Sequence, residues 1–574
     1  MNADYWRHRR TPAHLAFRAA RDVLLANRGD HDGARRRFRW PRLARFNWAL
    51  EWFDVIAADN PRTALVLLDG RGGEQVVSFA ELSVRSDAVA VWLRRLGVRR
   101  GDRVLLALGQ RVELWECLLA CLKLGVVVIP TYTSLTAAEV ADRVPRGEVA
   151  HVICEAWLTD LFARVDLRTR VAVGGTRPGW QAFADSQDAG PFLPGRPTAG
   201  ADIAFGYFTS GTTARPKLVA HTHTSYPVGH LSSMYWSGLV PGDRHLNVSA
   251  PGWAKHSWSS LFVPWNAEAT IVVLPDGPPP VADLPVLLAR HRVDSFCAPP
   301  SVWRPLAAYA DTARPRLREA TSAGEPLDTA AAAAIASAWQ ITVRDGYGQT
   351  ETTALIGTTP GLTARPGWLG APLPGYTISL RDPETGLPGR SGEVCVELCE
   401  TPVGIAAGYL GEPGRAFGGD YYRTGDLGER DARGFVRVVG RRDDVFKSFD
   451  HRVSPYEVEA VVRAHPAVED VAVIPRPHPV GGATPHAVVV PLPGRTADRQ
   501  LADAVLRHVA RHCPPHAMAR SVEFADRLPK TGSGKVRRSA LRVGSRCFAI
   551  DDIDDMTGGH DAQRPGVTES AVGA

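Results

Sequence analysis

Lysine is the least used charged residue of this chain. Lysine and arginine together number 67, and only six of these residues are lysines, namely Lys123, Lys217, Lys255, Lys447, Lys530 and Lys535. An ammonium is a compact charge on a flexible stem, whereas a guanidinium is a planar fork, so the two are not interchangeable at a phosphate or a developing oxyanion. Where arginine fills the ordinary cationic positions, we expect the remaining lysines to mark sites that need an ammonium.

The chain also lacks the segments that define membrane and secreted proteins. It has no apolar run of about 18 residues, the length that a membrane-spanning helix needs. Its first residues, MNADYWRHRR, lack the apolar stretch of a signal peptide. We therefore expect a soluble cytoplasmic protein without an integral membrane segment.

The cysteine pattern gives no sign of a disulfide framework or a metal site. The eight cysteines form no CxxC pair and have no histidine at metal-ligand spacing. Cys395 and Cys399 fall in EVCVELCE, whose alternation predicts a strand with both thiols on one face. We expect buried, reduced thiols.

Positive charge is concentrated at the start of the chain. The formal net charge is +6, and 12 arginines lie in the first 46 residues. Such a basic arm either contacts nucleic acid or an anionic membrane, or is a solvated extension. Because the rest of the chain carries no nucleic-acid-binding motif, we expect a solvated extension and no nucleic-acid partner.

The order of apolar segments indicates an α/β protein with more than one hydrophobic core. Amphipathic stretches at 81–97 and 113–125 alternate with apolar runs at 103–108 and 126–130, as in βα units around a parallel sheet. A second series follows Thr209, and short strands with Gly/Pro turns occupy 370–439. We predict a basic N-terminal extension (1–45), an N-terminal domain of two doubly wound subdomains plus a small β subdomain (46–440), a small mobile α+β C-terminal domain (441–545) and a disordered tail (546–574).

The segment YFTSGTTARPK carries the clearest chemistry. Its hydroxyls, glycine and lysine make a flexible loop of donors suited to a polyphosphate, and they are Thr209, Ser210, Gly211, Thr212, Thr213 and Lys217. The loop is not a Walker motif, because GxxxxGK[ST] is absent.

Five further motifs follow this loop in a fixed order. They are Gly324-Glu325-Pro326, Asp345-Gly346-Tyr347-Gly348-Gln349-Thr350-Glu351, Tyr422-Arg423-Thr424-Gly425-Asp426, Gly440-Arg441-Arg442-Asp443-Asp444 and Pro529-Lys530-Thr531-Gly532-Ser533-Gly534-Lys535. With them, roughly residues 45–545 resemble the adenylate-forming superfamily, most closely the short- and medium-chain acyl-CoA synthetases. The resemblance implies ATP, Mg²⁺ and CoA as cofactors and a small carboxylic acid as substrate.

The same resemblance implies a role for each motif in forming an acyl-AMP. The Thr209–Lys217 loop would hold the β- and γ-phosphates, Thr350 would contact the α-phosphate and Glu351 would bind Mg²⁺. Tyr347 would stack on adenine against Gly324-Glu325-Pro326, with Asp345, Gly346, Gly348 and Gln349 beside it, and Asp426 would accept the ribose hydroxyls. Lys535 would bridge the substrate carboxylate and the α-phosphate, cancelling charge where bonds form.

For the second step, the resemblance implies a rotation of the C-terminal domain. Asp443 would be the hinge, Arg441 and Arg452 would contact the nucleotide, and rotation would exchange Lys535 for the Lys447 loop in thioester formation. The family often has glycine where this chain has Phe449-Asp450, a change that would narrow or reshape the pantetheine channel. The acceptor is therefore CoA or, as an alternative, an amine or a carrier-protein thiol.

The acid is larger than acetate by the same comparison, because Gly348 stands where acetate-specific members carry a tryptophan. Trp253, Ala254, Lys255 and His256 align with the acyl pocket. Either Lys255 and His256 recognise a hydroxy, keto or second carboxylate group, or Lys255 points to solvent or forms a surface ion pair. We expect Lys123 to be an ordinary helix-face cation, and Lys530 to be either a surface cation or part of its motif. A non-catalytic scaffold remains a second alternative, and the oligomeric state stays open.

Overall fold

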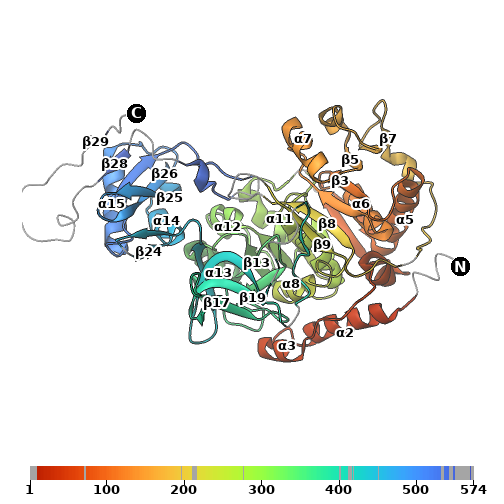
Figure 1. The fold of residues 1–574 in the computed structure, drawn as a ribbon, viewed down its shortest axis with the longest axis horizontal. Coiled ribbons are helices and arrows are strands. Elements are labelled where there is room, and N and C mark those ends of the chain that lie inside the picture. The colour runs from red at the N-terminus through yellow and green to blue at the C-terminus, as the bar shows by residue number, and fades with distance from the viewer. Residues whose placement is uncertain are drawn as a thin grey trace, which may run out of the picture.

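The computed structural model describes residues 9–541 with gaps at 70–72, 196, 210–215, 276, 400–401, 412–416, 418, 450 and 532–534, and two short strands beyond them. A large body is followed by a small C-terminal domain, blue in Figure 1, which stands at one end of it. The predicted disordered tail, 546–574, lies outside the described residues except for β28 (Cys547–Ala549) and β29 (Glu569–Ser570).

The body contains two large sheets. The eight-stranded sheet has the order β20 (Gly408–Tyr409), β9 (Leu218–Thr222), β8 (Ile203–Phe208), β4 (Val127–Pro130), β3 (Arg103–Ala107), β5 (His151–Glu155), β6 (Thr169–Val173) and β7 (Gln181–Ala182). The nine-stranded sheet has the order β16 (Ala371–Pro372), β15 (Ala354–Gly357), β14 (Val343–Gly348), β13 (Glu319–Ala323), β12 (Ser295–Ala298), β10 (Arg244–Asn247), β11 (Thr270–Val273), β1 (Thr63–Leu68) and β2 (Glu74–Ser78). Both sheets are parallel in the middle and antiparallel at an edge, which confirms the predicted α/β class.

Helices cover both faces of each sheet because alternate residues of the strands point to opposite sides. The largest core lies between the sheets and includes α5 (Phe79–Arg95), α6 (Val112–Leu124), α8 (His230–Ser237) and α10 (Val263–Asn266). The outer face of the nine-stranded sheet packs under α11 (Leu284–Arg290), α12 (Pro300–Ala307) and α13 (Thr329–Trp339), and that of the other sheet under α7 (Ala137–Arg146). α9 (Ala254–Ser257) is a single turn that follows β10.

Local sequence fixes where these helices begin and end. Ser78 and Glu81 form a reciprocal capping box at the start of α5, which satisfies two backbone N–H groups that would otherwise lack partners. Gly125 ends α6 with a φ of +72°, a left-handed conformation that favours glycine.

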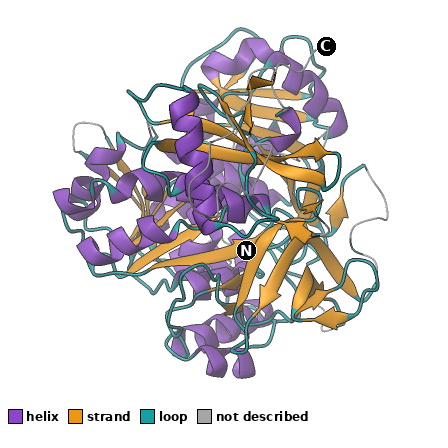
Figure 2. Ribbon diagram, turned by 90° about the vertical axis from the view of Figure 1, so that its left-hand side faces the viewer, coloured by secondary structure: helices purple, strands orange, loops and turns teal. Residues whose placement is uncertain are grey.

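Figure 2 shows helices and strands mixed through the whole molecule, which also has two further five-stranded sheets. A five-stranded antiparallel sheet has the order β18 (Pro388–Gly389), β17 (Ile378–Arg381), β19 (Ser391–Glu397), β21 (Tyr421–Arg430) and β22 (Val436–Arg441). The C-terminal domain contains β23 (Phe446–Ser448), β24 (His451–Val453), α14 (Pro455–Arg463), β25 (Val468–His478), β26 (Gly482–Pro491), α15 (Arg499–His512) and β27 (Ser521–Phe524) around a core of its own. Within the described part of the chain, no helix is long and apolar enough to cross a membrane.

The N-terminal arm is not solvated, so that expectation was wrong. α2 (Pro12–Ala26) and α3 (His31–Arg37) lie against the body, and Phe17 and Leu24 are fully buried. Arg21 donates to the Asn266 carbonyl oxygen at 2.8 Å. Phe17, Ala20 and Leu24 share one helical face, and burying this face against the body outweighs the solvation of the neighbouring arginines.

Two further expectations fail on burial. The Lys123 side chain is 0% exposed, and its Nζ lies 2.8 Å from Asp54 and 2.6 Å from Asp87, so it is a buried ion-pair partner rather than a helix-face cation. Cys395 is buried in β19, but Cys399 is exposed beyond the end of that strand. The turn after Glu397 ends the alternation on which the prediction for both thiols rested.

Candidate active site

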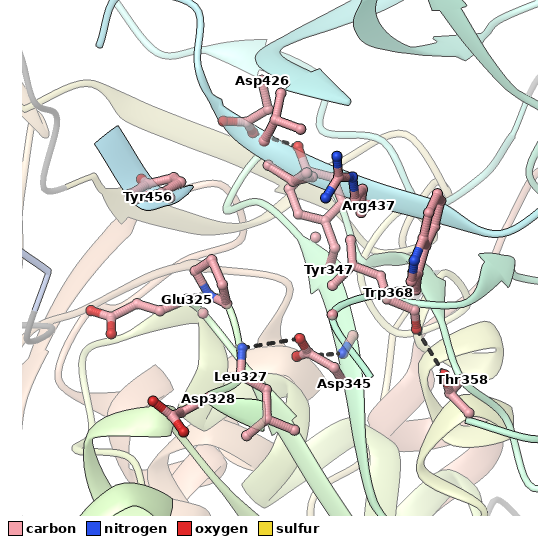
Figure 3. A pocket seen from close by; sticks show the side chains of 18 of the residues that line it. Glu325, Leu327, Asp328, Asp345, Tyr347, Thr358, Trp368, Asp426, Arg437 and Tyr456 are labelled. Carbon is pink, nitrogen blue, oxygen red and sulfur yellow. Dashed lines mark hydrogen bonds between the residues drawn. The ribbon is translucent and has the colours of Figure 1, made fainter. Parts of the chain in front are cut away.

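One cleft of about 2160 Å³ between the body and the C-terminal domain contains residues of all six motifs. Its lining includes Thr209, Lys217, Gly324, Glu325, Pro326, Asp345, Gly346, Tyr347, Gly348, Gln349, Thr350, Glu351, Asp426, Arg441, Asp443, Lys530 and Lys535. The lining residues come from segments more than 300 positions apart in sequence, so tertiary folding alone brings them together. Figure 3 shows Glu325, Asp345, Tyr347 and Asp426 around this space.

The motif on β14 is held by backbone contacts at its first residue. Asp345 accepts hydrogen bonds from the backbone N–H groups of Leu327, at 3.2 Å, and Gly346, at 2.9 Å (Figure 3). Burial raises the pKa of Asp345 to about 7. A Cβ on Gly346 would lie 2.4 Å from the Trp236 ring, so this position needs glycine for close packing.

Asp426 is the centre of a hydrogen-bonded group at the end of β14. Its Oδ2 accepts from the Tyr347 hydroxyl and from Gln349 Nε2, the latter at 2.7 Å, and its Oδ1 pairs with Arg441 Nη1 at 3.2 Å. Tyr422 donates to Gln349 Oε1 at 2.8 Å. The carboxylate predicted to hold the ribose is therefore oriented by the residues predicted to hold the adenine and by Arg441.

Tyr409 joins the phosphate loop to the predicted metal ligand. The Lys217 ammonium lies 4.6 Å from the Tyr409 ring centroid, and the Tyr409 hydroxyl donates to Glu351 Oε1 at 2.9 Å. Thr209 and Lys217 close the loop through a backbone hydrogen bond of 2.8 Å. Ser210, Gly211, Thr212 and Thr213 lie outside the described residues.

His221 on β9 holds the backbone of Thr350. Its Nε2 lies 2.7 Å from the Thr350 carbonyl oxygen, which can only accept, so Nε2 carries the proton and Nδ1 accepts from Ser225. Burial lowers the pKa of His221 to about 4. The sequence analysis did not single out His221 or Tyr409. His221 follows the phosphate loop closely, and Tyr409 lies between the Glu351 motif and the Tyr422–Asp426 motif.

The C-terminal residues predicted for the first step and those predicted for the second step lie in different places. Lys535 lines the cleft, whereas Lys447 and Arg452 pair across β23 and β24 and are not among the cleft residues. Lys530 forms an ion pair with Asp470 at 2.7 Å. Phe449 has a φ of +48° and packs against His478 and Gly481, with Arg520 over its ring at 4.7 Å.

The predicted acyl-pocket residues of the segment 253–256 lie beside the cleft and do not line it, whereas Gly348 does. Trp253 stacks on Tyr132 with ring centroids 5.4 Å apart, and the Ala254 carbonyl accepts from Tyr226 at 3.0 Å. Lys255 is partly buried and donates to the Ala323 carbonyl oxygen at 3.2 Å, next to Gly324. His256 is buried, and burial lowers its pKa to about 3.

Gly348 is placed in the cleft by a close backbone approach. A Cβ at this position would lie 2.3 Å from the Thr353 carbonyl oxygen. A larger residue here would therefore require the Thr353 backbone to move. Close backbone packing thus favours glycine at the position predicted to set the size of the acid.

The described residues contain no group of three or more His, Cys, Asp or Glu side chains that would form a metal site by themselves. Mg²⁺ takes oxygen ligands and usually combines one or two carboxylates with substrate phosphates and water. Glu351 at the cleft, beside the phosphate loop, fits that donor set.

Comparison with known proteins decides the family. Residues 53–410 match the AMP-binding enzyme family, and residues 457–535 match the AMP-binding enzyme C-terminal domain. The chain belongs to this family. Its members in the adenylate-forming superfamily share the large body and small C-terminal domain described above.

The relatives of this family member are acyl-CoA ligases. The chain is 37% identical over 516 residues to 4-hydroxybutyrate–CoA ligase 1 of Metallosphaera sedula, covering 87% of this chain and 91% of the relative. It is 30% identical to the mouse mitochondrial acyl-coenzyme A synthetase ACSM3, covering 92% of this chain and 96% of the relative. The anthranilate CoA ligase AuaEII bound to anthranoyl-AMP superposes with a TM-score of 0.77 at 26% identity, over 87% of this chain and 97% of that one.

ATP-bound MatB from Rhodopseudomonas palustris has a TM-score of 0.73 at 26% identity, over 84% of this chain and 96% of that one.

The present chain is an AMP-forming acyl-CoA synthetase: it activates a carboxylic acid with ATP to an acyl-AMP and transfers the acyl group to CoA. This excludes the scaffold alternative, and it favours CoA over an amine or a carrier protein as acceptor.

Proposed function

We propose that this synthetase activates a short- to medium-chain acid, larger than acetate, that carries a hydroxyl or another second polar group. The observation that carries the proposal is the placement of Lys255. Its ammonium has three N–H donors, and it donates one hydrogen bond, to Ala323, in a partly buried position beside the nucleotide motifs. No ion pair neutralises Lys255 within the part of the chain that the structure describes.

The electrostatics around Lys255 support recognition of a neutral or anionic oxygen. Burial lowers the pKa of Lys255, Asp345 and Glu325 oppose this effect, and the positive charge of Lys535 adds to it. An acyl chain with a terminal hydroxyl would supply an acceptor to an ammonium that is otherwise costly to desolvate. The 4-hydroxybutyrate named for the Metallosphaera relative has this chemistry.

We further propose the roles of the site residues in forming the acyl-AMP. The substrate carboxylate attacks the α-phosphorus of ATP, a new O–P bond forms, and the bond to the β-phosphate oxygen breaks to release pyrophosphate. Lys535 and Lys217 place positive charge beside the phosphate oxygens that gain negative charge, and Thr350 faces the α-phosphate. Glu351 would hold Mg²⁺, which supplies charge neutralisation for the phosphates when bound.

The second step needs the other face of the C-terminal domain. We propose that rotation about Asp443 withdraws Lys535 and brings the loop of Lys447 and Arg452 to the cleft, where the CoA thiolate attacks the acyl carbon and AMP leaves. The support is the present arrangement, in which Lys535 lines the cleft and Lys447 does not. Phe449 packs on the β25–β26 turn and is held in the loop that would move.

An acid panel tests the substrate class. Acid-dependent ATP–pyrophosphate exchange would be measured with acetate, butyrate, 4-hydroxybutyrate, succinate and benzoate for the wild type and Lys255→Met. Lys447→Met is the matched control, because Lys447 is exposed and does not line the cleft. We expect 4-hydroxybutyrate to exceed butyrate in kcat/KM, and Lys255→Met to lower that ratio about tenfold. An unchanged ratio in Lys255→Met would remove Lys255 from substrate recognition.

A further inference from the structure

The turn of the N-terminal arm between α2 and α3 is attached to α8 and to the segment after β15, the strand that pairs with β14. The Asn27 carbonyl accepts from the Tyr235 hydroxyl at 3.2 Å, and His31 Nδ1 lies 3.2 Å from Thr359 Oγ1. Arg28 Nε donates to the Gly238 carbonyl at 2.9 Å, just after α8. These contacts join residues about 200 to 330 positions apart in sequence, so the arm is bound by tertiary contacts alone.

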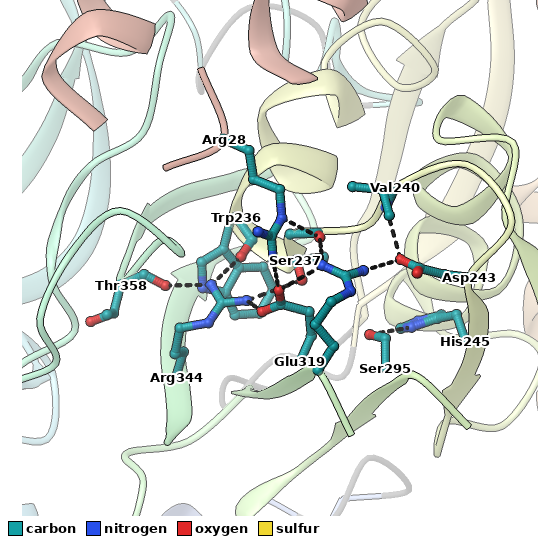
Figure 4. A network of polar contacts seen from close by, with 12 residues as sticks. Arg28, Trp236, Ser237, Val240, Asp243, His245, Ser295, Glu319, Arg344 and Thr358 are labelled. Carbon is teal, nitrogen blue, oxygen red and sulfur yellow. Dashed lines mark hydrogen bonds and ion pairs between the residues drawn. The ribbon is translucent and has the colours of Figure 1, made fainter. Parts of the chain in front are cut away.

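Within this attachment, one buried carboxylate is shared by three arginines. The Glu319 side chain, 4% exposed on β13, pairs with Arg28 and Arg318 through Oε1 and with Arg344 through Oε2 (Figure 4). Arg318 also pairs with Asp243. Arg28 and Arg318 line the nucleotide cleft, and the N–H groups that face Glu319 and Gly238 already have acceptors, so the group is a structural network rather than an anion site.

Arg344 connects this network to the nucleotide motif on β14. It stands one residue before Asp345 and donates to the carbonyl oxygens of Trp236, of Ser237 at 3.0 Å and of Thr358 at 2.8 Å. Burial lowers the pKa of Arg344 to about 9. A buried guanidinium that links three segments can stay in place only while its countercharge is held, and that countercharge is Glu319.

Two residues that Arg344 binds also contact Asp345, the residue that follows it. Trp236, whose carbonyl Arg344 binds, donates from its ring Nε1 to the Asp345 carbonyl at 3.2 Å and fills the space beside Gly346. Thr358 donates its backbone N–H to the same Asp345 carbonyl at 3.1 Å. A shift of Arg344 would therefore move Trp236, Thr358 and the backbone that carries Asp345 and Tyr347.

We propose that Arg28 is a positioning residue for ATP: through Glu319 and Arg344 it fixes the strand that presents Asp345, Gly346 and Tyr347 to the nucleotide. The N-terminal arm is then a working part of the adenylation site and not an appendage. Loss of the Arg28 charge leaves Glu319 with Arg318 and Arg344, of which Arg318 is also bound to Asp243. The inference rests on the proposed nucleotide role of the β14 motif and not on the identity of the acid.

Direct binding of Mg²⁺–ATP to the full-length protein tests this role without any acid. Calorimetry would compare the wild type, Arg28→Gln and Arg28→Lys with Arg36→Gln, the same substitution at an exposed arginine of α3. We expect Kd for ATP to rise about tenfold in Arg28→Gln and about threefold in Arg28→Lys, because lysine keeps the charge but loses the fork. We expect Arg36→Gln to match the wild type.

A second measurement separates positioning from folding. With acyl-AMP supplied, the KM for CoA should stay unchanged in both Arg28 variants, and the melting temperature of Arg28→Lys should stay near that of the wild type. If Arg28→Gln does not fold, Arg28→Lys alone decides through its Kd for ATP. A Kd for ATP equal to that of the wild type in every folded Arg28 variant would overturn the inference. A weaker ATP binding accompanied by a similar rise in the KM for CoA and by a lower melting temperature would overturn it too. Failure of the wild type to bind ATP would instead overturn the nucleotide site itself.

Discussion

The Tyr347 hydroxyl donates a hydrogen bond to the Asp426 carboxylate across 79 positions of sequence. This contact joins the end of β14, in the nine-stranded sheet, to β21 in the five-stranded sheet. The predicted adenine and ribose contacts are therefore fixed relative to each other before a nucleotide binds.

Removing this hydroxyl should weaken ATP use. Tyr347→Phe keeps the ring for stacking but leaves Asp426 with Gln349 and Arg441, so we expect KM for ATP in pyrophosphate exchange to rise about fivefold, equivalent to about 1 kcal/mol for one hydrogen bond. Tyr309→Phe, at a tyrosine that is 42% exposed, is the control. A KM equal to that of the control would show that Asp426 is oriented without Tyr347.

Lys535 and Lys447 should affect different half-reactions. Lys535 lines the cleft, so Lys535→Ala should lower acyl-AMP formation about 100-fold or more while thioester formation from supplied acyl-AMP changes little. Lys447→Ala, at an exposed residue that does not line the cleft, should leave acyl-AMP formation close to wild type and lower thioester formation from supplied acyl-AMP. Equal losses in the two half-reactions of Lys535→Ala would contradict the rotation about Asp443.

Tyr409 allows its two contacts to be separated. Tyr409→Phe keeps the ring beside Lys217 and loses the hydrogen bond to Glu351, whereas Tyr409→Leu loses both. We expect Tyr409→Phe to raise the Mg²⁺ concentration needed for half-maximal ATP binding about threefold, and Tyr409→Leu also to weaken ATP binding at saturating Mg²⁺. Calorimetric titration with ATP at several Mg²⁺ concentrations gives both values, and identical behaviour of the two variants would refute this division.

Acid should destabilise the fold through its buried histidines. Burial lowers the pKa of His221, His223 and His245 to about 4, below the ordinary value of 6.5, so the unfolded chain binds protons in this range that the folded chain does not. Stability is therefore retained above pH 6.5 and lost as the pH falls towards 4, by at most about 1.4 kcal/mol per pH unit for each histidine.

Urea unfolding between pH 4 and 7 measures this slope. His221→Gln should make the loss with falling pH less steep, whereas His512→Gln, at an exposed histidine of α15, should leave the slope as it is. Asp345 acts in the opposite direction, because a raised carboxyl pKa of about 7 lowers stability as the pH rises from 3.8 to 7. A slope that is the same in both histidine variants would mean that His221 does not stay neutral in the fold.

Lys123 should matter for stability and not for catalysis. Lys123→Met leaves the buried carboxylates of Asp54 and Asp87 without their cation, which costs about 3 kcal/mol or more. We expect a lower melting temperature with an unchanged KM for ATP in the protein that remains folded. The double substitution that also replaces Asp87 by asparagine should recover part of the loss, and no recovery would argue against an ion-pair origin.

Motif order and periodicity predicted the α/β class and several elements of the body. The stretches at 81–97 and 113–125 are the helices α5 and α6, and the apolar runs at 103–108 and 126–130 are the strands β3 and β4. These predictions depend on local patterns that the fold does not override, because both sheets bury both of their faces. The predicted site assignments remain proposals, although the described motif residues for the first step line one cleft.

The local sequence could not predict which polar and charged side chains are buried. In the sequence, Lys123 and the arginines of the N-terminal arm cannot be told from solvated cations. They are distinguished only by the packing of α6 against Asp54 and Asp87 and of the arm against Glu319. Tyr409 and His221 were missed for a related reason, since their hydrogen-bond partners, Glu351 and Thr350, are 58 and 129 positions away.

The sequence alone indicated that this protein adenylates an acid, because its phosphate loop and five further motifs follow in the order that resembles the adenylate-forming superfamily. It also singled out the scarce lysines. Only the tertiary structure decided which of them line the cleft, which one is fully buried and which lie outside the cleft, because a charge acquires its role from the distance and burial of its partners.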